Sequence, residues 1–257
     1  MHITIKRSTI WARELAVVLS SGLEPLAFVW LSASGDASMS GWPPGLSASP
    51  GALEVFKAEL RELGARRLLI SHVDSSSAVA SHETASRIST YRVYEGKPPF
   101  EPDQFRTDMT TSSLCETDPT AFDNAFLQSA HGSRDPFYRT GAEHSLQLLR
   151  HWNATDATGV GHAFWLTNGA QRELVAVGSY RKLDAYTALG QHVGIIPSHR
   201  GQRRGFMVGF DLAAKLHEDT VTWLISYVAE ENTASFRYLE AAGHGVTGQF
   251  DLYELVL

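Results

Sequence analysis

A short segment in the last third of the chain constrains the fold most strongly. Residues 193–196 are rich in β-branched side chains and predict a strand, Pro197 marks a turn, and residues 198–205 (SHRGQRRG) form a basic loop with two glycines. Residues 206–217 then carry apolar side chains at helical spacing. A strand, a glycine-containing loop and a helix start together favour an anion site, because the first N–H groups of a helix point outward without intrahelical partners.

The side chains of this loop fit the same interpretation. Gly201 and Gly205 allow the main chain to approach phosphate oxygens closely, and Arg200, Arg203 and Arg204 supply charge-assisted donors around the rim. We therefore predict a pyrophosphate site here. A surface turn with a solvated basic cluster is the alternative for such a loop taken alone.

Composition narrows the class of partner. The chain has 257 residues, 43% of them hydrophobic, and its 22 basic against 28 acidic residues give a net charge of −6. That balance disfavours a nucleic-acid surface and tolerates a cationic amine. No apolar run is long enough to span a bilayer, and charged residues interrupt the apolar stretch at 16–33. We expect a cytoplasmic protein, monomer or homodimer, with a small-molecule partner and no membrane or nucleic-acid partner.

The sequence offers no metal site. Cys115 is the only cysteine, so neither an internal disulfide nor a cysteine-based metal centre is expected. The 11 histidines show no HExxH or similar spacing. We predict no metal.

From residue 118 onward the pattern alternates clearly between helices and strands. Asp118 is a candidate N-cap, and Asn168-Gly169 is a strong hairpin signal. The expected elements are a helix at 120–131, a turn-rich loop at 132–138, a helix at 142–152, strands at 162–167, 173–183 and 189–196, a helix at 206–217, a strand at 221–228, a helix at 232–242 and a strand at 249–257. This order, ααβββαβαβ, predicts a mixed α/β layer structure rather than a Rossmann sheet.

The N-terminal third is less regular. It predicts a loop at 34–51, a helix at 50–63, a strand at 66–73, a helix at 78–88 and a strand at 90–94. The order echoes that of residues 206–257, which suggests either an incomplete internal copy or a small accessory αβ subdomain. We divide the chain into an N-terminal subdomain (1–96), a linker (97–104) and a main domain (105–257).

Two groups of residues carry a family resemblance. Ile195-x-Pro197-x-x-Arg200-Gly201-x-x-x-Gly205, followed by Asn232-x-x-Ser235 through Gly243, resembles the GNAT superfamily of acyl-CoA-dependent N-acetyltransferases. The resemblance runs from about residue 103 to the end of the chain. It implies an α/β fold with a central splayed, mostly antiparallel sheet flanked by helices, beside the small N-terminal αβ subdomain. It also implies acetyl-CoA as acyl donor and direct transfer of the acetyl group to a primary amine.

The resemblance assigns cofactor contacts. The loop before the central helix binds the pyrophosphate, the strand edge around Ile195 pairs with the pantetheine, and the next strand splays away near Tyr227. Asn232 touches the pantetheine arm, a role compatible with that of helix N-cap. The implied cofactor-binding residues are Ile195, Ile196, Arg200, Gly201, Gln202, Arg203, Arg204, Gly205 and Asn232.

Two positions depart from the family pattern. Arg203 stands where the first of two glycines is usual, so either its side chain swings outward or CoA binding is altered. Leu239 stands where many members have the tyrosine that protonates the CoA thiolate. Tyr238, about 100° away around the helix, is the candidate acid, with a packed tyrosine as the alternative. The candidate bases are His199, Glu230, Glu231 and Tyr227.

A narrower similarity concerns the acceptor. Phe126-Leu127-Gln128-Ser129, residues 133–138, residues 149–153, Asn232-Thr233-Ala234 and Tyr253 are similar to the TDP-fucosamine acetyltransferases. That similarity implies a nucleotide-linked amino sugar as acceptor, with Arg134, Phe137 and Tyr138 near the acceptor cleft. The alternatives are another amine, such as an amino acid, a polyamine, an antibiotic or a protein N-terminus, and a non-catalytic acyl-CoA-binding module.

Overall fold

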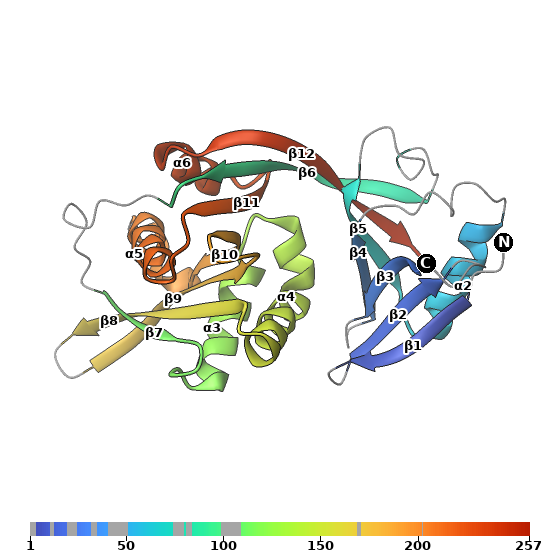
Figure 1. Ribbon diagram of the computed structural model, residues 1–257, viewed down its shortest axis with the longest axis horizontal. Helices are drawn as coiled ribbons and strands as arrows, with labels where there is room; N and C mark the ends of the chain where they lie inside the picture. Colours follow the sequence, from blue (N-terminus) through green and yellow to red (C-terminus); the bar gives the residue numbers. More distant parts are fainter. Residues whose placement is uncertain are drawn as a thin grey trace. The chain divides into compact units, whose positions relative to one another are not determined.

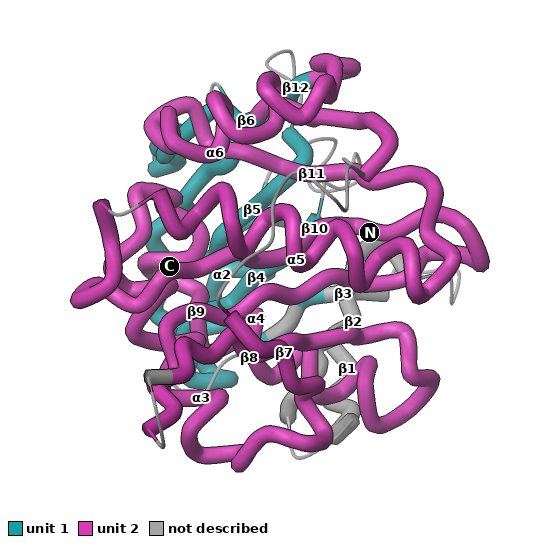
Figure 2. The backbone as a smooth tube through the Cα atoms, turned by 90° about the vertical axis from the view of Figure 1, so that its left-hand side faces the viewer, with its two compact units in different colours: residues 1–91, 249–257 teal, residues 92–248 magenta. Residues whose placement is uncertain are grey.

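The structure is a computed structural model of the 257-residue chain. It describes residues 4–10, 13–19, 25–31, 35–40, 51–73, 80, 84–98, 109–168, 171–201 and 203–257. The chain divides into two compact units, which Figure 2 colours separately: residues 1–91 with 249–257, and residues 92–248.

The first unit is an antiparallel meander that ends in one parallel connection. Its first four strands pair antiparallel in chain order: β1 (Thr4–Ile10), β2 (Arg13–Leu19), β3 (Pro25–Leu31) and β4 (Asp36–Ser40). Helix α2 (Ala52–Glu62) then connects β4 to β5 (Arg67–Val73), which lies parallel to β4. The end of the chain completes this unit, because Asp251 to Val256 of β12 pair antiparallel with β5.

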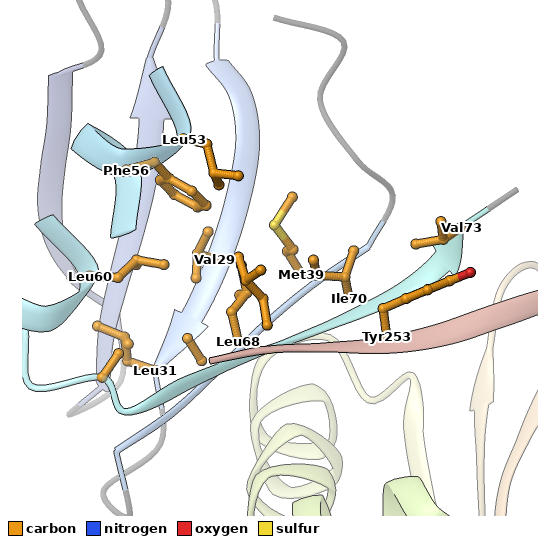
Figure 3. Packing of buried hydrophobic residues seen from close by; sticks show 13 residues of the cluster. Val29, Leu31, Met39, Leu53, Phe56, Leu60, Leu68, Ile70, Val73 and Tyr253 are labelled. Atoms are coloured by element: carbon orange, nitrogen blue, oxygen red, sulfur yellow. The ribbon is translucent and has the colours of Figure 1, made fainter. Parts of the chain in front are cut away.

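Helix α2 buries one apolar face on this sheet. Leu53, Phe56 and Leu60 recur at helical spacing, and the latter two are fully buried. They pack against strand residues that include Met39 and Ile70 (Figure 3). Full burial of each such side chain stabilises the fold by about 2 kcal/mol. The first unit therefore has a hydrophobic core of its own.

The sequence predicted part of this unit. The expected helix at 50–63 and strand at 66–73 are confirmed as α2 and β5. The expected loop at 34–51 was wrong for residues 36–40, which form β4. The expected helix at 78–88 was wrong for residues 85–88, which begin the long strand β6 (Ala85–Gly96). Residues 85–88 form a strand and not a helix because β6 has a neighbouring strand on each side, β12 and β11. Most of 78–84 lies outside the described residues.

The second unit contains a mixed sheet with the strand order β6-β11-β10-β9-β8-β7. Neighbouring strands from β7 to β10 are antiparallel, and β10 and β11 are parallel. The elements are β7 (Met109–Ser113), α3 (Pro119–His131), α4 (Pro136–Thr155), β8 (Gly159–Asn168), β9 (Gln171–Lys182), β10 (Thr187–Ile195), α5 (Arg204–Glu218), β11 (Trp223–Ala229), α6 (Thr233–Ala241) and β12 (Gly245–Val256). The predicted order ααβββαβαβ is confirmed, and the short edge strand β7 precedes it.

Helix α4 starts earlier than the sequence suggested. Residues 136–138 were expected in a loop, but they form the first turn of α4. The carboxylate of Asp135 accepts hydrogen bonds from the N–H groups of Phe137 (3.0 Å) and Tyr138 (3.4 Å), and Pro136 stands at the first helical position. An Asp-Pro pair is therefore an N-cap signal here, as the pair Asp118-Pro119 is for α3.

The helices of the second unit cover opposite faces of its sheet (Figure 1). Val177 of β9 packs in the cluster that contains Phe122 of α3 and Leu149 of α4. The next residue, Gly178, faces α5, since a Cβ added there would lie 3.2 Å from Leu212. Successive strand residues point to opposite faces, so α3 and α4 lie on one face and α5 on the other.

Strands β6 and β12 each belong to both units. The first part of β6 and the last part of β12 lie in the first unit, and their other ends lie in the second. The sequence-based division placed residues 249–257 in the main domain, whereas these residues group with the first unit through their pairing with β5. Of the expected linker at 97–104, residues 99–104 lie outside the described part of the chain.

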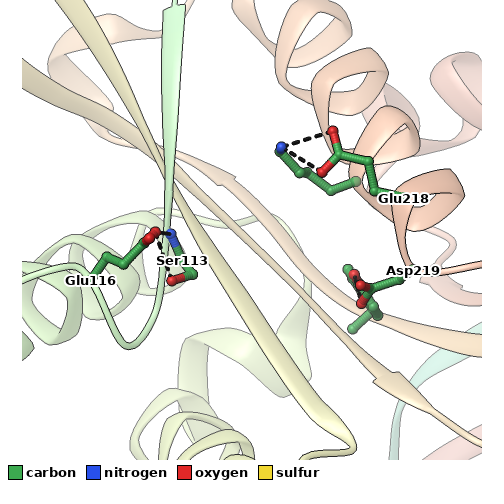
Figure 4. Close-up of polar contacts among 6 residues, drawn as sticks. Ser113, Glu116, Glu218 and Asp219 are labelled. Atoms are coloured by element: carbon green, nitrogen blue, oxygen red, sulfur yellow. Dashed lines mark hydrogen bonds and ion pairs between the residues drawn. The ribbon is translucent and has the colours of Figure 1, made fainter.

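Polar contacts hold the C-terminal end of α5 and the turn before α3. Asp219, the C-cap of α5, accepts a hydrogen bond from the Tyr180 hydroxyl (2.8 Å) and pairs with Lys182 (2.8 Å), both on β9. Before α3, Glu116 accepts hydrogen bonds from the N–H (2.9 Å) and hydroxyl (2.8 Å) of Ser113 (Figure 4). The C-terminal end of α5 is thereby fixed to β9, which sets where its N-terminal end lies.

A close approach between α4 and β8 tests this packing. A Cβ added at Gly159 would lie 2.5 Å from the Leu149 carbonyl oxygen and 2.9 Å from the Asn153 nitrogen, both main-chain atoms that cannot rotate away. We expect Gly159→Ala to lower the free energy of unfolding by about 2 kcal/mol, measured by urea denaturation. Gly245→Ala is the matched control, because nothing lies within 4 Å of a Cβ there. Equal stability of the two variants would contradict this packing.

Candidate functional site

The parallel strands β10 and β11 part in the middle of the second unit's sheet. They pair from Thr187 opposite Trp223 to Gly190 opposite Ser226, and no pair follows. At the same point the register of β10 with β9 shifts, so that Gln191 is an extra residue. The rest of β10 stays paired with β9 through Ile195. Beyond Gly190, the β10 edge that faces β11 therefore has no strand pairing among the described residues as far as Ile195, whose carbonyl accepts a hydrogen bond from Arg200.

The basic loop connects the parted end of β10 to α5. Residues Pro197–His199 form a single 3-10 turn, Gly201 has a φ of 79°, and α5 begins at Arg204. As the first residues of the helix, Arg204 and Gly205 have N–H groups without intrahelical acceptors. A Cβ added at Gly205 would have no atom within 4 Å, so the approach to these N–H groups is open. Gln202 lies outside the described residues.

Arg203 adopts the backbone conformation of the glycine that it replaces. Its φ of 57° and ψ of 9° are left-handed, and it is the N-cap of α5. Its side chain is exposed. Left-handed geometry costs a non-glycine residue about 1 kcal/mol or more. The turn that the loop needs is therefore formed with arginine in place, at a cost in backbone strain.

The side chain of Arg200 is hydrogen-bonded within the protein, and its expected contact with the cofactor stays a prediction. Its Nε donates to the Ile195 carbonyl (3.0 Å), and its two terminal nitrogens donate to the carbonyls of Ser129 (3.0 Å) and Gly132. The guanidinium thus caps the C-terminal end of α3, where the helix dipole favours a cation. Its side chain holds the loop against α3, which leaves the loop's main chain as the candidate donor to an anion.

Arg204 belongs to a short polar chain. Its guanidinium donates to Nδ1 of His199, and Nε2 of His199 lies 3.1 Å from the Glu173 carboxylate. Because arginine can only donate, Nδ1 of His199 must be the acceptor and Nε2 carries the proton. His199, a candidate base from the sequence, is therefore already engaged between Arg204 and Glu173.

The start of α6 agrees with one of the two roles given to Asn232. Its side-chain oxygen accepts a hydrogen bond from the Ser235 N–H (3.4 Å), so Asn232 is the N-cap. Leu239 is buried in an apolar cluster with Tyr94 and Val228.

Tyr238 packs against α5. Its ring lies edge-on to Phe206 (centroids 5.7 Å apart), and a Cβ added at Gly209 would overlap it. Burial raises the pKa of Tyr238, so the phenol keeps its proton. Both earlier interpretations of Tyr238, packed tyrosine and acid, need a protonated hydroxyl. Its role as the acid stays a prediction.

A buried histidine on β10 was missed by the sequence analysis. Nε2 of His192 lies 2.8 Å from the Ser129 hydroxyl of α3, and its ring packs against Phe126 (4.7 Å) and Tyr138 (4.8 Å). Burial, and then the nearby Arg200 cation, lower the pKa of His192 to about 3. A polar residue among the apolar residues of a strand was the available signal.

The other predicted residues are dispersed. Arg134 is exposed, whereas Phe137 and Tyr138 form an edge-on aromatic pair on the first turn of α4. Of the candidate bases, Glu230 and Glu231 are exposed in the turn after β11. Burial, with the charge of Glu95, raises the pKa of Tyr227. Of this set, Tyr138 contacts His192 (ring centroids 4.8 Å apart).

The described residues contain no group of three or more His, Cys, Asp or Glu side chains that could hold a metal ion. Within the same residues, no helix is long and apolar enough to cross a membrane.

Comparison with solved structures decides the fold. A tandem GNAT protein from the clavulanic acid biosynthesis pathway matches 95% of this chain and 82% of its own, with a TM-score of 0.60 and 17% identity. The protein has the GNAT fold. A GCN5-related N-acetyltransferase from Sphaerobacter thermophilus covers 94% of this chain and 80% of its own (TM-score 0.61, 14% identity). A GCN5-related N-acetyltransferase from Kribbella flavida covers 90% of this chain and 86% of its own, with a TM-score of 0.59 and 12% identity. The fold class expected from the sequence is confirmed.

Sequence comparison adds nothing to this fold assignment. No protein-family model matches the sequence, and no curated protein matches it significantly. At these low identities the GNAT likeness describes the fold alone.

Backbone strain at Arg203 gives a stability prediction. Arg203→Gly should raise the free energy of unfolding by about 1 kcal/mol, because glycine adopts the left-handed conformation without strain. Arg203→Ala, which keeps the Cβ, is the control and should change it by less than about 0.5 kcal/mol. Urea denaturation measures both. A destabilised glycine variant would show that Arg203 is not strained in the folded protein.

Two buried histidines make the fold acid-sensitive. Burial lowers the pKa of His162 from 6.5 to about 4 and that of His192 to about 3. Above pH 6.5 both are neutral in the folded and unfolded chain. Below it the unfolded chain binds protons that the folded chain does not, so the free energy of unfolding falls by about 1.4 kcal/mol per pH unit for each histidine.

Urea denaturation from about pH 7 to about pH 5 measures this slope. His162→Asn and His192→Asn should each remove one histidine's share of it. An unchanged slope in either variant would contradict the burial of that imidazole in its neutral form.

Proposed function

We propose that this protein is an acetyl-CoA-dependent N-acetyltransferase that transfers an acetyl group directly to a primary amine of a small molecule. The observation that carries the proposal is the parting of β10 from β11 directly before the loop that leads into α5. An extended thioester arm fits an unpaired strand edge, and a pyrophosphate fits the first N–H groups of a helix. Both features occur here on one continuous stretch of chain.

The residues present fit that co-substrate. The main chain at Gly201 and Arg203 to Gly205 would hold the pyrophosphate, with Arg204 beside it, and the edge of β10 between Gly190 and Ile195 would pair with the pantetheine amides. Ile196 is already engaged, because its N–H donates to the Val175 carbonyl (2.9 Å) and its carbonyl accepts from the His199 N–H (2.9 Å). Arg203, one of the two departures from the family pattern, does not oppose this fit, because its backbone already has the left-handed geometry. Acetyl-CoA supplies an activated acetyl thioester.

The residues of this chain would then position the two reactants and stabilise the charges that form during transfer. Main-chain donors on the parted strand would stabilise the oxyanion that forms when the amine attacks the carbonyl. Holding the two reactants together removes much of the entropic barrier. Tyr238 is the proposed acid for the departing thiolate, and its phenol is protonated at neutral pH because burial raises its pKa.

Within this class we propose a nucleotide-linked amino sugar as the acceptor. A nucleotide-linked amino sugar is supported by the sequence similarity around residues 126–138, and by the location of Tyr138 beside His192 on the α3 and α4 face. A net charge of −6 is compatible with any cationic amine. The tight packing of Tyr238 and the leucine at 239 favour the second candidate function, a non-catalytic acyl-CoA-binding module.

We further propose that the first unit is a degenerate copy of the second. In the first, β1 to β4 form an antiparallel meander, α2 leads to the parallel β5, and β12 follows in the sheet. In the second, β7 to β10 do the same, α5 leads to the parallel β11, and β6 follows. Each copy thus ends with a strand from the other half of the chain. The similar clavulanic acid pathway protein is itself a tandem GNAT protein.

Only one copy has a basic loop. The residues between β4 and α2, GWPPGLSASP at 41–50, contain no lysine or arginine and lie outside the described residues. The corresponding segment before α5 has two arginines, Arg200 and Arg203, and a third, Arg204, begins the helix. We therefore propose one acyl-CoA site per chain.

A glycine substitution tests the cofactor site. Acetyl-CoA should raise the melting temperature of the protein, and Gly205→Leu should abolish that shift because the side chain would occupy the space of the phosphates. Gly205 has no atom within 4 Å of an added Cβ, so the variant should fold normally. Gly245→Leu, equally open, is the matched control and should keep the shift. No shift in the parent protein would overturn the cofactor assignment.

A panel of amines tests the activity. Release of free thiol from acetyl-CoA, measured with amino sugars, amino acids, polyamines and aminoglycosides, should identify an accepted class. Binding of acetyl-CoA without thiol release beyond the amine-free rate would favour the binding module over the enzyme.

A further inference from the structure

The amine must lose a proton during transfer, and three of the four candidate bases from the sequence are poorly placed for this. His199 is engaged by Arg204 and Glu173, and Glu230 and Glu231 lie in the turn beyond β11. The fourth, Tyr227, has a pKa raised by burial and is protonated at neutral pH. We infer that His192 is the residue that accepts this proton, through Nδ1, and that Ser129 positions it. The inference rests on the proposed function and names a residue that the sequence did not.

Hydrogen bonding fixes which nitrogen of His192 can accept. The Ser129 hydroxyl donates to the Phe126 carbonyl (2.9 Å) and has only one proton. Its contact of 2.8 Å with Nε2 of His192 must therefore be a hydrogen bond that Nε2–H donates to the hydroxyl oxygen. A neutral imidazole protonated on Nε2 keeps a lone pair on Nδ1. The ring cannot turn freely, because Phe126 and Tyr138 flank it.

The location of His192 on β10 suits the reaction. Gly190 makes the last pair with β11, so His192 lies in the parted segment. His192 pairs with Ser179, and Gly194 with Val177, whose side chain faces α3 and α4. Val193 and Ile195 point to the opposite face, that of α5. The acyl donor's phosphates and the proposed base thus lie on opposite faces of the strand, and an amine could enter from the face of α3 and α4.

Gly194, two residues after His192, leaves the space that the His192 and Ser129 side chains occupy. A Cβ added at Gly194 would collide with the Ser129 side chain and with the His192 ring. The hydroxyl of Ser179, the cross-strand neighbour of His192, is buried and has no hydrogen-bond partner among the described residues. It offers a further polar atom on the same face.

The proton balance is simple. The amine nitrogen forms a bond to the acetyl carbon, the C–S bond breaks with its electron pair on sulfur, and one N–H proton passes to Nδ1 of His192. Loss of that proton to solvent, and protonation of the thiolate, restore the starting state. Burial of the ring keeps it unprotonated across the physiological range. The ionisable groups that face it are Tyr138 from α4 and Arg200 from the loop.

Nitrogen NMR of the histidine side chains in the wild-type protein tests the tautomer without any turnover. We expect a signal for His192 with Nε2 protonated and Nδ1 unprotonated, unchanged down to about pH 5. Ser129→Ala should convert it to a mixture of tautomers. A signal with the proton on Nδ1 would overturn the inference, since that nitrogen could not accept another.

Kinetics test the role in the reaction. His192→Asn should lower kcat by about 100-fold or more while the binding of acetyl-CoA is unchanged, and free imidazole should restore part of the loss in His192→Ala. His162→Asn is the matched control, because His162 is equally buried and has a lowered pKa, yet it lies on β8 and faces α5. Its turnover should match that of the wild type.

The outcomes separate this inference from the proposed function. Normal kcat in His192→Asn overturns the role of His192 and leaves the acetyltransferase intact. Acetyl-CoA binding without turnover on any amine, in the wild type, overturns the activity and the role of His192 together. If His192→Asn does not fold, Ser129→Ala decides: an unchanged kcat for that variant overturns the positioning role.

Discussion

The separation of two parallel strands is the constraint on which the second unit depends. β10 and β11 are held together by only four residue pairs, and the extra residue Gln191 turns the rest of β10 away. Three contacts hold the elements around this gap in place. Arg200 ties the end of β10 to the end of α3, Ser129 holds His192, and Asp219 fixes the far end of α5 to β9. Each joins main chain or side chains from different elements, so the gap is built by the surrounding structure and not by the two strands alone.

The same geometry relates the sheet to the proposed chemistry. A strand with one unpaired edge offers main-chain groups to an extended ligand, and a helix that starts at the end of that strand offers N–H groups to an anion. The alternation of side chains along β10 then puts α5 on one face and His192 with Tyr138 on the other. Donor and acceptor can approach the same strand from two sides without competing for space.

The sequence predicted what depends on local order. The helix and strand order from residue 118 onward, the N-caps Asp118 and Asn232 and the fold class follow from periodicity and capping, which are short-range properties. What it missed depends on residues far apart in the chain. The side chain of Arg200 reaches carbonyls about 70 positions away instead of a ligand. β4 forms in a stretch rich in Gly and Ser because β3 and β5 pair with it. Residues 251–256 group with the first unit because they pair with β5. The role proposed for His192 depends on its contact with Ser129 of α3, more than 60 positions away in the chain.

The most direct test of the account is a titration of the protein with acetyl-CoA, followed by backbone amide NMR. The account predicts saturation at one molecule per chain, with the largest shifts at the amides of Ile195, Ile196 and the loop from Gly201 to Gly205. It also predicts that the amides of α2 and β5 stay unchanged. Saturable shifts centred on α2, or no saturable shifts at all, would contradict the assignment of the parted strands and the basic loop as the acyl-CoA site.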